Sequence, residues 1–265
     1  MKRNGNRRPG LVLQERDRHL LRELSVMRVI DREQAKLVAG FGSTTRANLR
    51  LLRLTEAKLL RRFFLGTVAG GRRAIYVLTE RGAQLADVAY HGLWRRRSDE
   101  LLVADFFVRH QLLVNDFYCA LRYRPIPVPG VRFSRWIAFS KPLAAWLPLI
   151  PDGYFDLETP RGTGACFIEI DRGGESLTVW KEKVRNYLAF IDSEEPQRLF
   201  GQNRFRVLVV ANSSRRMLSI RRAVGSLTDR LFWFTECELK EEDLWNRVWL
   251  RPSGDDRQAL IELNP

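Results

Sequence analysis

The second half of the chain alternates apolar runs with amphipathic segments, and this order constrains the fold more than any other feature. The run Arg204–Ala211 is apolar from Val207 onward, which is typical of a strand buried on both faces. Helical patterns over Leu177–Phe190 and Ser213–Val224 stand on either side of it, and Leu231–Thr235 predicts a further strand. Strands that alternate with helices in this way predict a small mixed α/β sheet.

Acidic residues stand at the ends of two apolar segments that precede these elements. Trp146–Ile150 leads into Asp152, and Cys166–Ile168 leads into Glu169. We therefore predict a short hairpin with Asp152 beside Glu169. Alternate residues of a strand share a face, so Asp171 is expected to point the same way as Glu169. Three close carboxylates suit Mg²⁺ or Mn²⁺, which prefer oxygen ligands and can activate a bound water. The predicted metal ligands are Asp152, Glu169 and Asp171.

This arrangement of Asp152 and Glu169 resembles the core of the PD-(D/E)XK nuclease-like superfamily, in which a lysine assists two metal-binding acids. The chain departs from that pattern because Asp171 stands where the lysine is expected. A lysine moved to the following helix is a known variation of the superfamily, and of Lys181 and Lys183 on that helix we favour Lys183. The alternative is a structural one, in which the acids form a turn and the wet face of an edge strand and the lysines are solvated.

The positive charge is concentrated in the first hundred residues. The net charge of the chain is +14, and residues 1–100 carry +12 of it, with 22 Lys and Arg against 10 Asp and Glu. The cations are dispersed through patterned segments and do not line one amphipathic helix. Nucleic acid is therefore favoured over a membrane surface as the partner.

The cysteines and the apolar runs indicate a reduced, cytoplasmic protein. No run of 18 apolar residues occurs, and no apolar stretch follows the basic start. The three cysteines, Cys119, Cys166 and Cys237, are far apart and each stands among apolar or aromatic residues. This spacing argues against a disulfide framework or a zinc site, and predicts reduced thiols in the core.

The first hundred residues predict a winged helix-turn-helix behind a disordered basic tail, residues 1–11. The segment Gln14–Leu24 has one apolar stripe, and Asp31 is placed to cap a short helix from Arg32 to Val38. The segment Gly42–Leu54 begins with capping hydroxyls and is predicted to be the helix that reads DNA.

Two extended segments follow the reading helix and predict a β-wing. Lys58–Leu65 and Arg72–Leu78 flank a glycine-containing turn, and Thr79–Ala86 opens another helix. The pattern Tyr76–Gly82, Tyr-x-Leu-Thr-x-x-Gly, resembles that of many winged-helix DNA-binding domains. Such domains also mediate protein contacts, which is the alternative here. The predicted groove contacts are Ser43, Thr44, Thr45, Arg46 and Arg50, and the predicted DNA-backbone contacts are Arg72 and Arg73.

A long amphipathic helix is predicted to open the second domain. Trp94–Arg97 is the predicted hinge, and Asp99–Leu121 has apolar residues at helical spacing. Nuclease-like proteins often carry an acidic residue on the helix before the core sheet, and Asp116 is the candidate for that catalytic role. The expected domains are a winged helix over residues 12–97 and a mixed-sheet PD-(D/E)XK nuclease-like α/β domain over residues 98–265.

The order of these motifs resembles the plasmid replication-relaxation family. The residues that carry the resemblance are His110–Asp116, Pro151-Asp152, Phe167–Gly173, Lys183 and Tyr187. The resemblance spans about residues 12–250. It implies a mobile-element protein that acts on double-stranded DNA during replication, relaxation or transfer.

Two functions remain open at this point. In the first, the winged helix binds DNA and the second domain is a scaffold, a homodimer contact or a dock for a relaxase, recombinase or replication protein. In the second, Asp152, Glu169 and Lys183 form a Mg²⁺- or Mn²⁺-dependent endonuclease or nickase.

Overall fold

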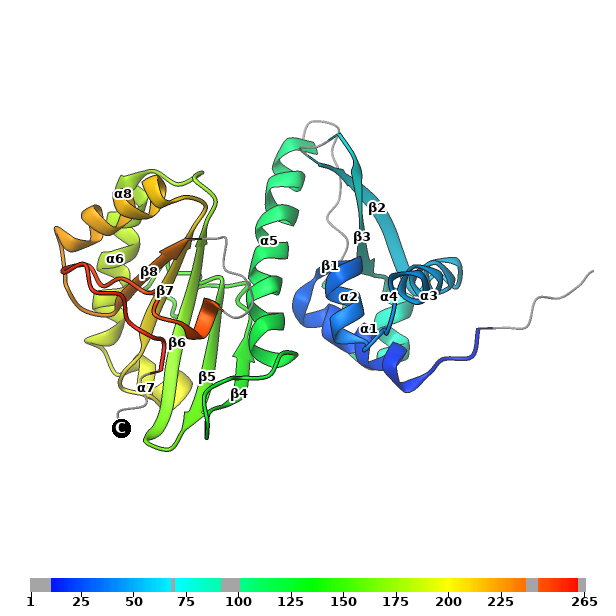
Figure 1. Ribbon diagram of the computed structural model, residues 1–265, viewed down its shortest axis with the longest axis horizontal. Coiled ribbons are helices and arrows are strands. Elements are labelled where there is room, and N and C mark those ends of the chain that lie inside the picture. The colour runs from blue at the N-terminus through cyan, green and yellow to red at the C-terminus, as the bar shows by residue number, and fades with distance from the viewer. Residues whose placement is uncertain (1–10, 68–69, 92–100, 237–242, 262–265) are drawn as a thin grey trace, which may run out of the picture. The chain divides into compact units, whose positions relative to one another are not determined.

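The computed structural model describes residues 11–67, 70–91, 101–236 and 243–261. It divides into two compact units, Met1–Cys119 and Ala120–Pro265. Each unit combines helices with one β-sheet, with eight α-helices and eight strands in the described ranges (Figure 1). The predicted α/β class is confirmed. The predicted hinge Trp94–Arg97 lies outside the described residues, and the domain ranges 12–97 and 98–265 stay predictions.

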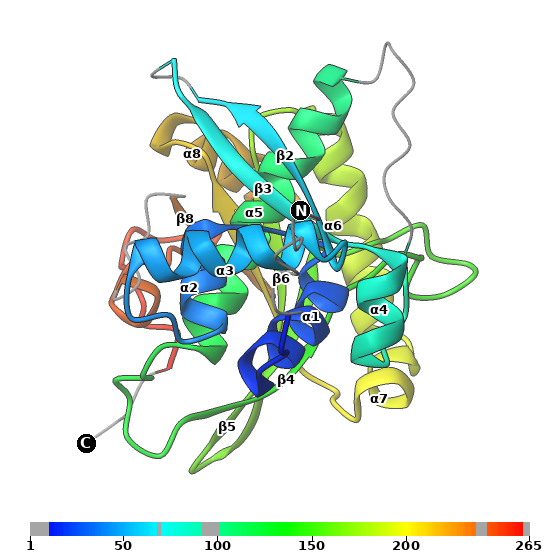
Figure 2. The ribbon, with the colours of Figure 1, turned by 90° about the vertical axis from the view of Figure 1, so that its right-hand side faces the viewer.

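The first unit is built of helices around a three-stranded antiparallel sheet of order β1-β3-β2. Figure 2 shows α2 and α3 in this unit, with the β2–β3 hairpin extending beyond them. Its elements are α1 (Glu15–Met27), β1 (Val29–Asp31), α2 (Arg32–Val38), α3 (Thr44–Glu56), β2 (Leu60–Gly66), β3 (Arg72–Leu78), α4 (Glu80–Ala86) and most of α5 (Leu101–Arg122).

Side-chain caps fix where three of these helices begin. The carboxylate of Asp31 accepts from the backbone N–H of Gln34 at 2.8 Å, and the hydroxyl of Thr79 accepts from that of Gly82 at 3.0 Å. Ser43 caps α3 in the same way. Each cap satisfies a backbone donor that the first helical turn leaves unpaired. The sequence predicted these three starts correctly, whereas the short strand β1 was not predicted.

The glycine of the Tyr76–Gly82 pattern is required by a close approach between backbones. A Cβ on Gly82 would lie 2.2 Å from the carbonyl oxygen of Leu59. The hydroxyl of Thr79 also donates to that oxygen, at 3.0 Å. Helix α4 can therefore pack against the start of the hairpin only if residue 82 has no side chain.

Helix α5 packs against the sheet of the first unit. Val108 and Leu112 join Val29, Ile75 and Val77 in one buried apolar cluster. Polar side chains reinforce this packing: the amide of Asn115 donates to the carbonyls of Met27 and Val29 at 3.1 and 2.6 Å, and the hydroxyl of Tyr118 donates to Glu23 at 2.6 Å. Most of the helix therefore belongs to the first unit, although the sequence suggested that it opens the second domain.

The second unit contains a five-stranded mixed sheet of order β4-β5-β6-β7-β8. Strands β4, β5 and β6 pair antiparallel, and β6, β7 and β8 pair parallel. Its elements are β4 (Arg132–Ile137), β5 (Gly153–Thr159), β6 (Gly162–Asp171), α6 (Leu177–Ile191), α7 (Glu195–Phe200), β7 (Arg206–Ala211), α8 (Ser214–Gly225), β8 (Phe232–Glu236) and the 3₁₀ turn η1 (Asp243–Trp245).

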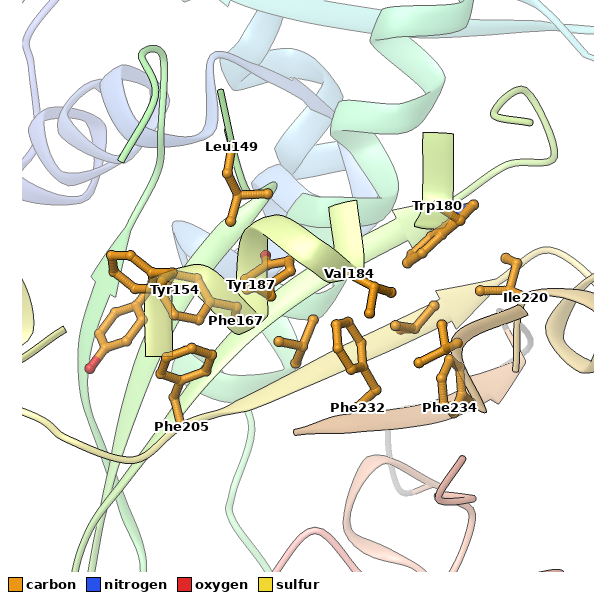
Figure 3. Close-up of a cluster of buried hydrophobic side chains, with 14 of the residues drawn as sticks. Leu149, Tyr154, Phe167, Trp180, Val184, Tyr187, Phe205, Ile220, Phe232 and Phe234 are labelled. Carbon is orange, nitrogen blue, oxygen red and sulfur yellow. The ribbon is translucent and has the colours of Figure 1, made fainter. Parts of the chain in front are cut away.

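Helices α6 and α8 share a hydrophobic core with the sheet. Trp180, Val184 and Tyr187 of α6 lie in one buried cluster with Phe232 and Phe234 of β8 and Ile220 of α8 (Figure 3). Phe167 of β6 is fully buried at the centre of the aromatic contacts. This packing fixes the register of α6 on the sheet and so determines which of its polar side chains reach β6.

One predicted segment is wrong. Trp146–Ile150 forms no strand. The hairpin is made by β5 and β6, and Asp152 immediately precedes β5. Pro148 and Pro151 explain the difference, because proline lacks the backbone donor that a strand ladder needs. Helix α7 was not predicted.

The described cysteines match the expectation of buried, reduced thiols. Cys119 and Cys166 are both buried and neither forms a disulfide within the described residues, and burial raises the pKa of the Cys166 thiol to about 12. Cys237 lies outside the described residues. None of the helices in the described ranges has the length and apolar character to cross a membrane.

Candidate functional site

The first candidate surface is the outer face of α3. Thr45 and Arg46 are exposed in its first turn. Ser43 and Thr44 are half-buried: Ser43 caps the helix, and the hydroxyl of Thr44 receives a hydrogen bond from Lys36 at 3.2 Å. Of the five residues predicted for the DNA groove, Thr45 and Arg46 are the ones that are exposed.

Arg50 has a structural partner. Its Nε donates to Asp17 Oδ1 at 2.8 Å, and a second guanidinium nitrogen bonds the other oxygen of Asp17 and the carbonyl of Val12. The Asp17 side chain is completely buried, whereas that of Arg50 is 11% exposed. The hydrogen bond to Asp17 raises the pKa of Arg50. This side chain therefore stabilises the packing of α3 on α1.

The β2–β3 hairpin presents a second set of cations. Arg72 is exposed at the start of β3, and Arg73 forms an ion pair with the buried Asp31 of β1. Arg62 of β2 was not predicted as a contact. It is exposed, and its guanidinium lies 5.2 Å from the ring centroid of the exposed Phe64. The alternation of β2 could have indicated this pair, because residues 62 and 64 lie on one face of the strand.

The second candidate site lies where β5 begins and β6 ends. Gly153 pairs with Ile168 in the antiparallel register, so that Asp152 comes opposite Glu169. The backbone N–H of Ile170 donates to Asp152 at 2.7 Å. A Cβ on Gly153 would lie 2.6 Å from the ring of Trp136, so glycine is needed for β5 to start so close to β4. Asp152 and Glu169 lie side by side, as the sequence predicted.

Glu169 is buried and both of its oxygens have donors. Lys183 Nζ lies 2.9 Å from Oε2, and the hydroxyl of Tyr187 lies 2.6 Å from Oε1. Burial raises the pKa of Glu169 to about 7, with the charge of Lys183 opposing this shift and that of Asp152 adding to it. Burial also raises the pKa of Tyr187, and the charge of Glu169 raises it further.

Lys183 bridges two carboxylates. Besides Glu169, it contacts both oxygens of Glu175 at 3.1 and 3.0 Å. Burial lowers the pKa of Lys183, but the negative charges of Glu169, Glu175 and Asp152 outweigh burial and raise it. Lys183 thus stays a cation between acids. The sequence predicted Lys183 for this position and missed Glu175, which has no regular spacing from the other acids.

Asp171 points to the helix side of the sheet, as Glu169 does, but it has its own partners. Arg216 of α8 binds both oxygens at 2.7 Å, and the indole N–H of Trp180 donates at 2.8 Å. Burial alone would raise the pKa of Asp171, but the hydrogen bonds from Arg216, Trp180 and Gly173 lower it. No sequence signal identified Arg216, because it lies 45 residues along the chain.

Comparison with known proteins places these residues in a family. The family model for replication-relaxation matches residues 21–203. The chain belongs to the replication-relaxation family. The match runs from α1 to just beyond α7 and includes Asp152, Glu169, Lys183 and Tyr187, whereas Arg216 lies beyond it. No curated protein and no solved structure matches this replication-relaxation protein. Membership suggests a role in plasmid replication or relaxation.

The carboxylates of this replication-relaxation protein do not fit a three-acid metal site. Asp152 and Glu169 carry the oxygen ligands that Mg²⁺ and Mn²⁺ prefer, but protein donors bind both oxygens of Glu169. Arg216 binds both oxygens of Asp171. Within the described ranges, no group of three or more His, Cys, Asp or Glu side chains could hold a metal ion. Lys183 is the cation that contacts Glu169, and Arg216 is the cation that contacts Asp171.

Asp116 lies in the first unit of this replication-relaxation protein. Its carboxylate accepts a hydrogen bond of 2.6 Å from the amide of Gln34, which also donates to the carbonyl of Leu112 at 2.9 Å. The contact joins α5 to α2. The catalytic role of Asp116 stays a prediction.

Proposed function

We propose that this protein binds double-stranded DNA through a winged helix in its first unit, and that it does so during plasmid replication or relaxation. The order of α2, α3 and the β2–β3 hairpin supports a winged helix, in which α3 enters the major groove and the hairpin contacts the DNA backbone or the minor groove. The charge of +12 over residues 1–100 supports a polyanionic partner.

The observation that carries the proposal is the set of exposed arginines on α3 and the wing. Arg46 and Arg53 project from α3, and Arg61, Arg62 and Arg72 project from the hairpin. Buried acids hold Arg50 and Arg73. The proposed set of DNA contacts therefore omits Arg50 and Arg73, which the sequence predicted as contacts.

Fluorescence anisotropy with a labelled 30-base-pair duplex tests the proposal across a series of salt concentrations. Arg46→Ala should weaken binding, and Arg62→Ala with Arg72→Ala should weaken it equally for all sequences and lower the salt slope by about one per lost phosphate contact. Arg215→Ala, at an exposed arginine of α8, is the matched control. Wild-type protein that fails to bind any duplex at low salt would disprove the proposal.

In this proposal the second unit is a scaffold, a homodimer contact or a dock for a relaxase, recombinase or replication protein. Protein donors bind every carboxylate oxygen of Glu169 and Asp171, which supports a structural role for these two acids. A protein partner would be found by mixing the purified full chain with each candidate and measuring the mass of the complex.

A second candidate function is DNA cleavage, favoured by the convergence of Asp152, Glu169 and Lys183 on one site. Supercoiled plasmid is incubated with protein in Mg²⁺ or Mn²⁺ and scored for nicked and linear forms. Nicking by the wild type that is lost in Glu169→Ala would establish an endonuclease. Intact but gel-shifted plasmid with both proteins would support the DNA-binding function alone.

A further inference from the structure

The centre of the exposed face of α3 is apolar. Leu49 is 49% exposed and Leu52 is 36% exposed. With Thr45 they follow a spacing of four and three residues, which places all three on one face of a helix. The opposite face carries the buried residues Ala47, Leu51 and Leu54. Leu49 and Leu52 are thus exposed on a helix whose buried face is already formed by other residues.

Arginines flank this apolar face. Arg46 and Arg53 are both exposed, lie seven residues apart, and project from one side of it. Arg50 lies between them along the helix but is held by Asp17. The surface is therefore an apolar centre with cations along one side, which we call the cationic border. Charge complementarity favours DNA over a protein partner, since a polyanion would neutralise the border while the centre contacts an apolar group.

The major groove of DNA offers one apolar group, the C5 methyl of thymine. We propose that Leu49 and Leu52 read thymine methyl groups in the major groove while Arg46 and Arg53 contact the adjoining phosphates. This inference rests on the proposed DNA-binding function and specifies the DNA that is bound. It predicts a preference for sites rich in thymine.

Two pairs of 30-base-pair duplexes isolate the methyl group. The first compares alternating A·T with alternating A·U, which differ only in that methyl, and the second compares alternating G·C with the same duplex containing 5-methylcytosine. Burying one methyl is worth about fourfold in affinity. Two contacts should therefore make the wild-type protein bind A·T about sixteenfold more tightly than A·U, and 5-methylcytosine more tightly than cytosine.

The Leu49→Ala, Leu52→Ala double variant should bind A·T and A·U equally. Both residues are exposed, so the fold should be retained, and circular dichroism checks this. Leu85→Ala is the matched control, because Leu85 is a 41% exposed leucine on α4 of the same unit. This control should keep the wild-type preference.

Three results would overturn parts of this reasoning. Equal binding of A·T and A·U by the wild type refutes methyl reading and leaves DNA binding intact. If the wild-type protein binds none of the four duplexes at low salt, the proposed DNA-binding function itself is refuted. A wild-type dimer in sedimentation that becomes a monomer in the double leucine variant assigns the apolar face to a second copy of the chain, and also refutes methyl reading.

Discussion

Replacing Arg50 by alanine tests whether this arginine of α3 stabilises the fold or contacts DNA. The guanidinium binds both oxygens of Asp17, whose side chain is 0% exposed. The substitution leaves that carboxylate buried without its cation, and breaking a buried ion pair from one side costs about 3 to 5 kcal/mol. Arg46→Ala removes an exposed arginine four residues earlier, so the expected change in stability is within about 0.5 kcal/mol.

Two measurements report separately on the stability of the two units. Six of the seven tryptophans follow Cys119, so tryptophan fluorescence in urea reports mainly on the second unit and serves as the internal control. Hydrogen exchange of the α1 and α3 amides reports on the first unit. In Arg50→Ala we expect the free energy of opening of α1 and α3 to fall by about 3 kcal/mol, with an unchanged fluorescence midpoint.

A double variant checks the electrostatic cause. Adding Asp17→Asn to Arg50→Ala removes the buried charge, so the double variant should be more stable than Arg50→Ala alone. The structural role of Arg50 would be refuted if the α1 and α3 amides of Arg50→Ala exchanged at wild-type rates while this variant lost more DNA affinity than Arg46→Ala. Arg50 would then be counted again among the proposed DNA contacts.

Three further predictions concern single residues. Gly82→Ala should destabilise the first unit by at least about 2 kcal/mol, because its Cβ would meet a backbone carbonyl; wild-type exchange rates in α4 would contradict this. Burial raises the pKa of Glu169 from 4.5 to about 7, so the folded state retains a proton that the unfolded chain has released. The second unit should therefore lose stability as the pH rises from 5 to 8, and Glu169→Gln should flatten that profile in urea unfolding. Arg216→Ala leaves Asp171 without its cation and should destabilise the second unit by about 3 kcal/mol, whereas Arg215→Ala at the exposed neighbour should have no effect.

Local signals predicted most elements of the fold. The caps at Asp31 and Ser43 and the start of the helix at Thr79 were predicted from the sequence, because a cap depends on one side chain and on backbone donors within three residues. The runs that form β7 and β8 were predicted because apolar strands buried on both faces have a distinct composition. The apolar segment Trp146–Ile150 does not form a strand of the hairpin, because Pro148 interrupts it and lacks the backbone donor of a strand.

The candidate site was predicted less completely. The spacing of Asp152, Glu169 and Lys183 correctly predicted that these three side chains lie close together, since they all come from one hairpin and the helix that follows it. Glu175 was missed because it lies in the loop between β6 and α6, where no periodicity predicts the direction of a side chain.

By itself, the sequence determined the α/β class, the caps of α2 and α3, the concentration of positive charge in the first hundred residues and the proximity of Asp152 and Glu169. Only the tertiary structure decided which charged groups are available. Arg46 and Arg50 have the same chemistry on one helix, but a buried carboxylate of α1 engages only Arg50. Glu169 and Asp171 share a face of β6, but Arg216 of α8 binds only Asp171. The partner of each of these buried acids comes from a distant part of the chain, so no local sequence pattern predicts which charged residue will pair with it.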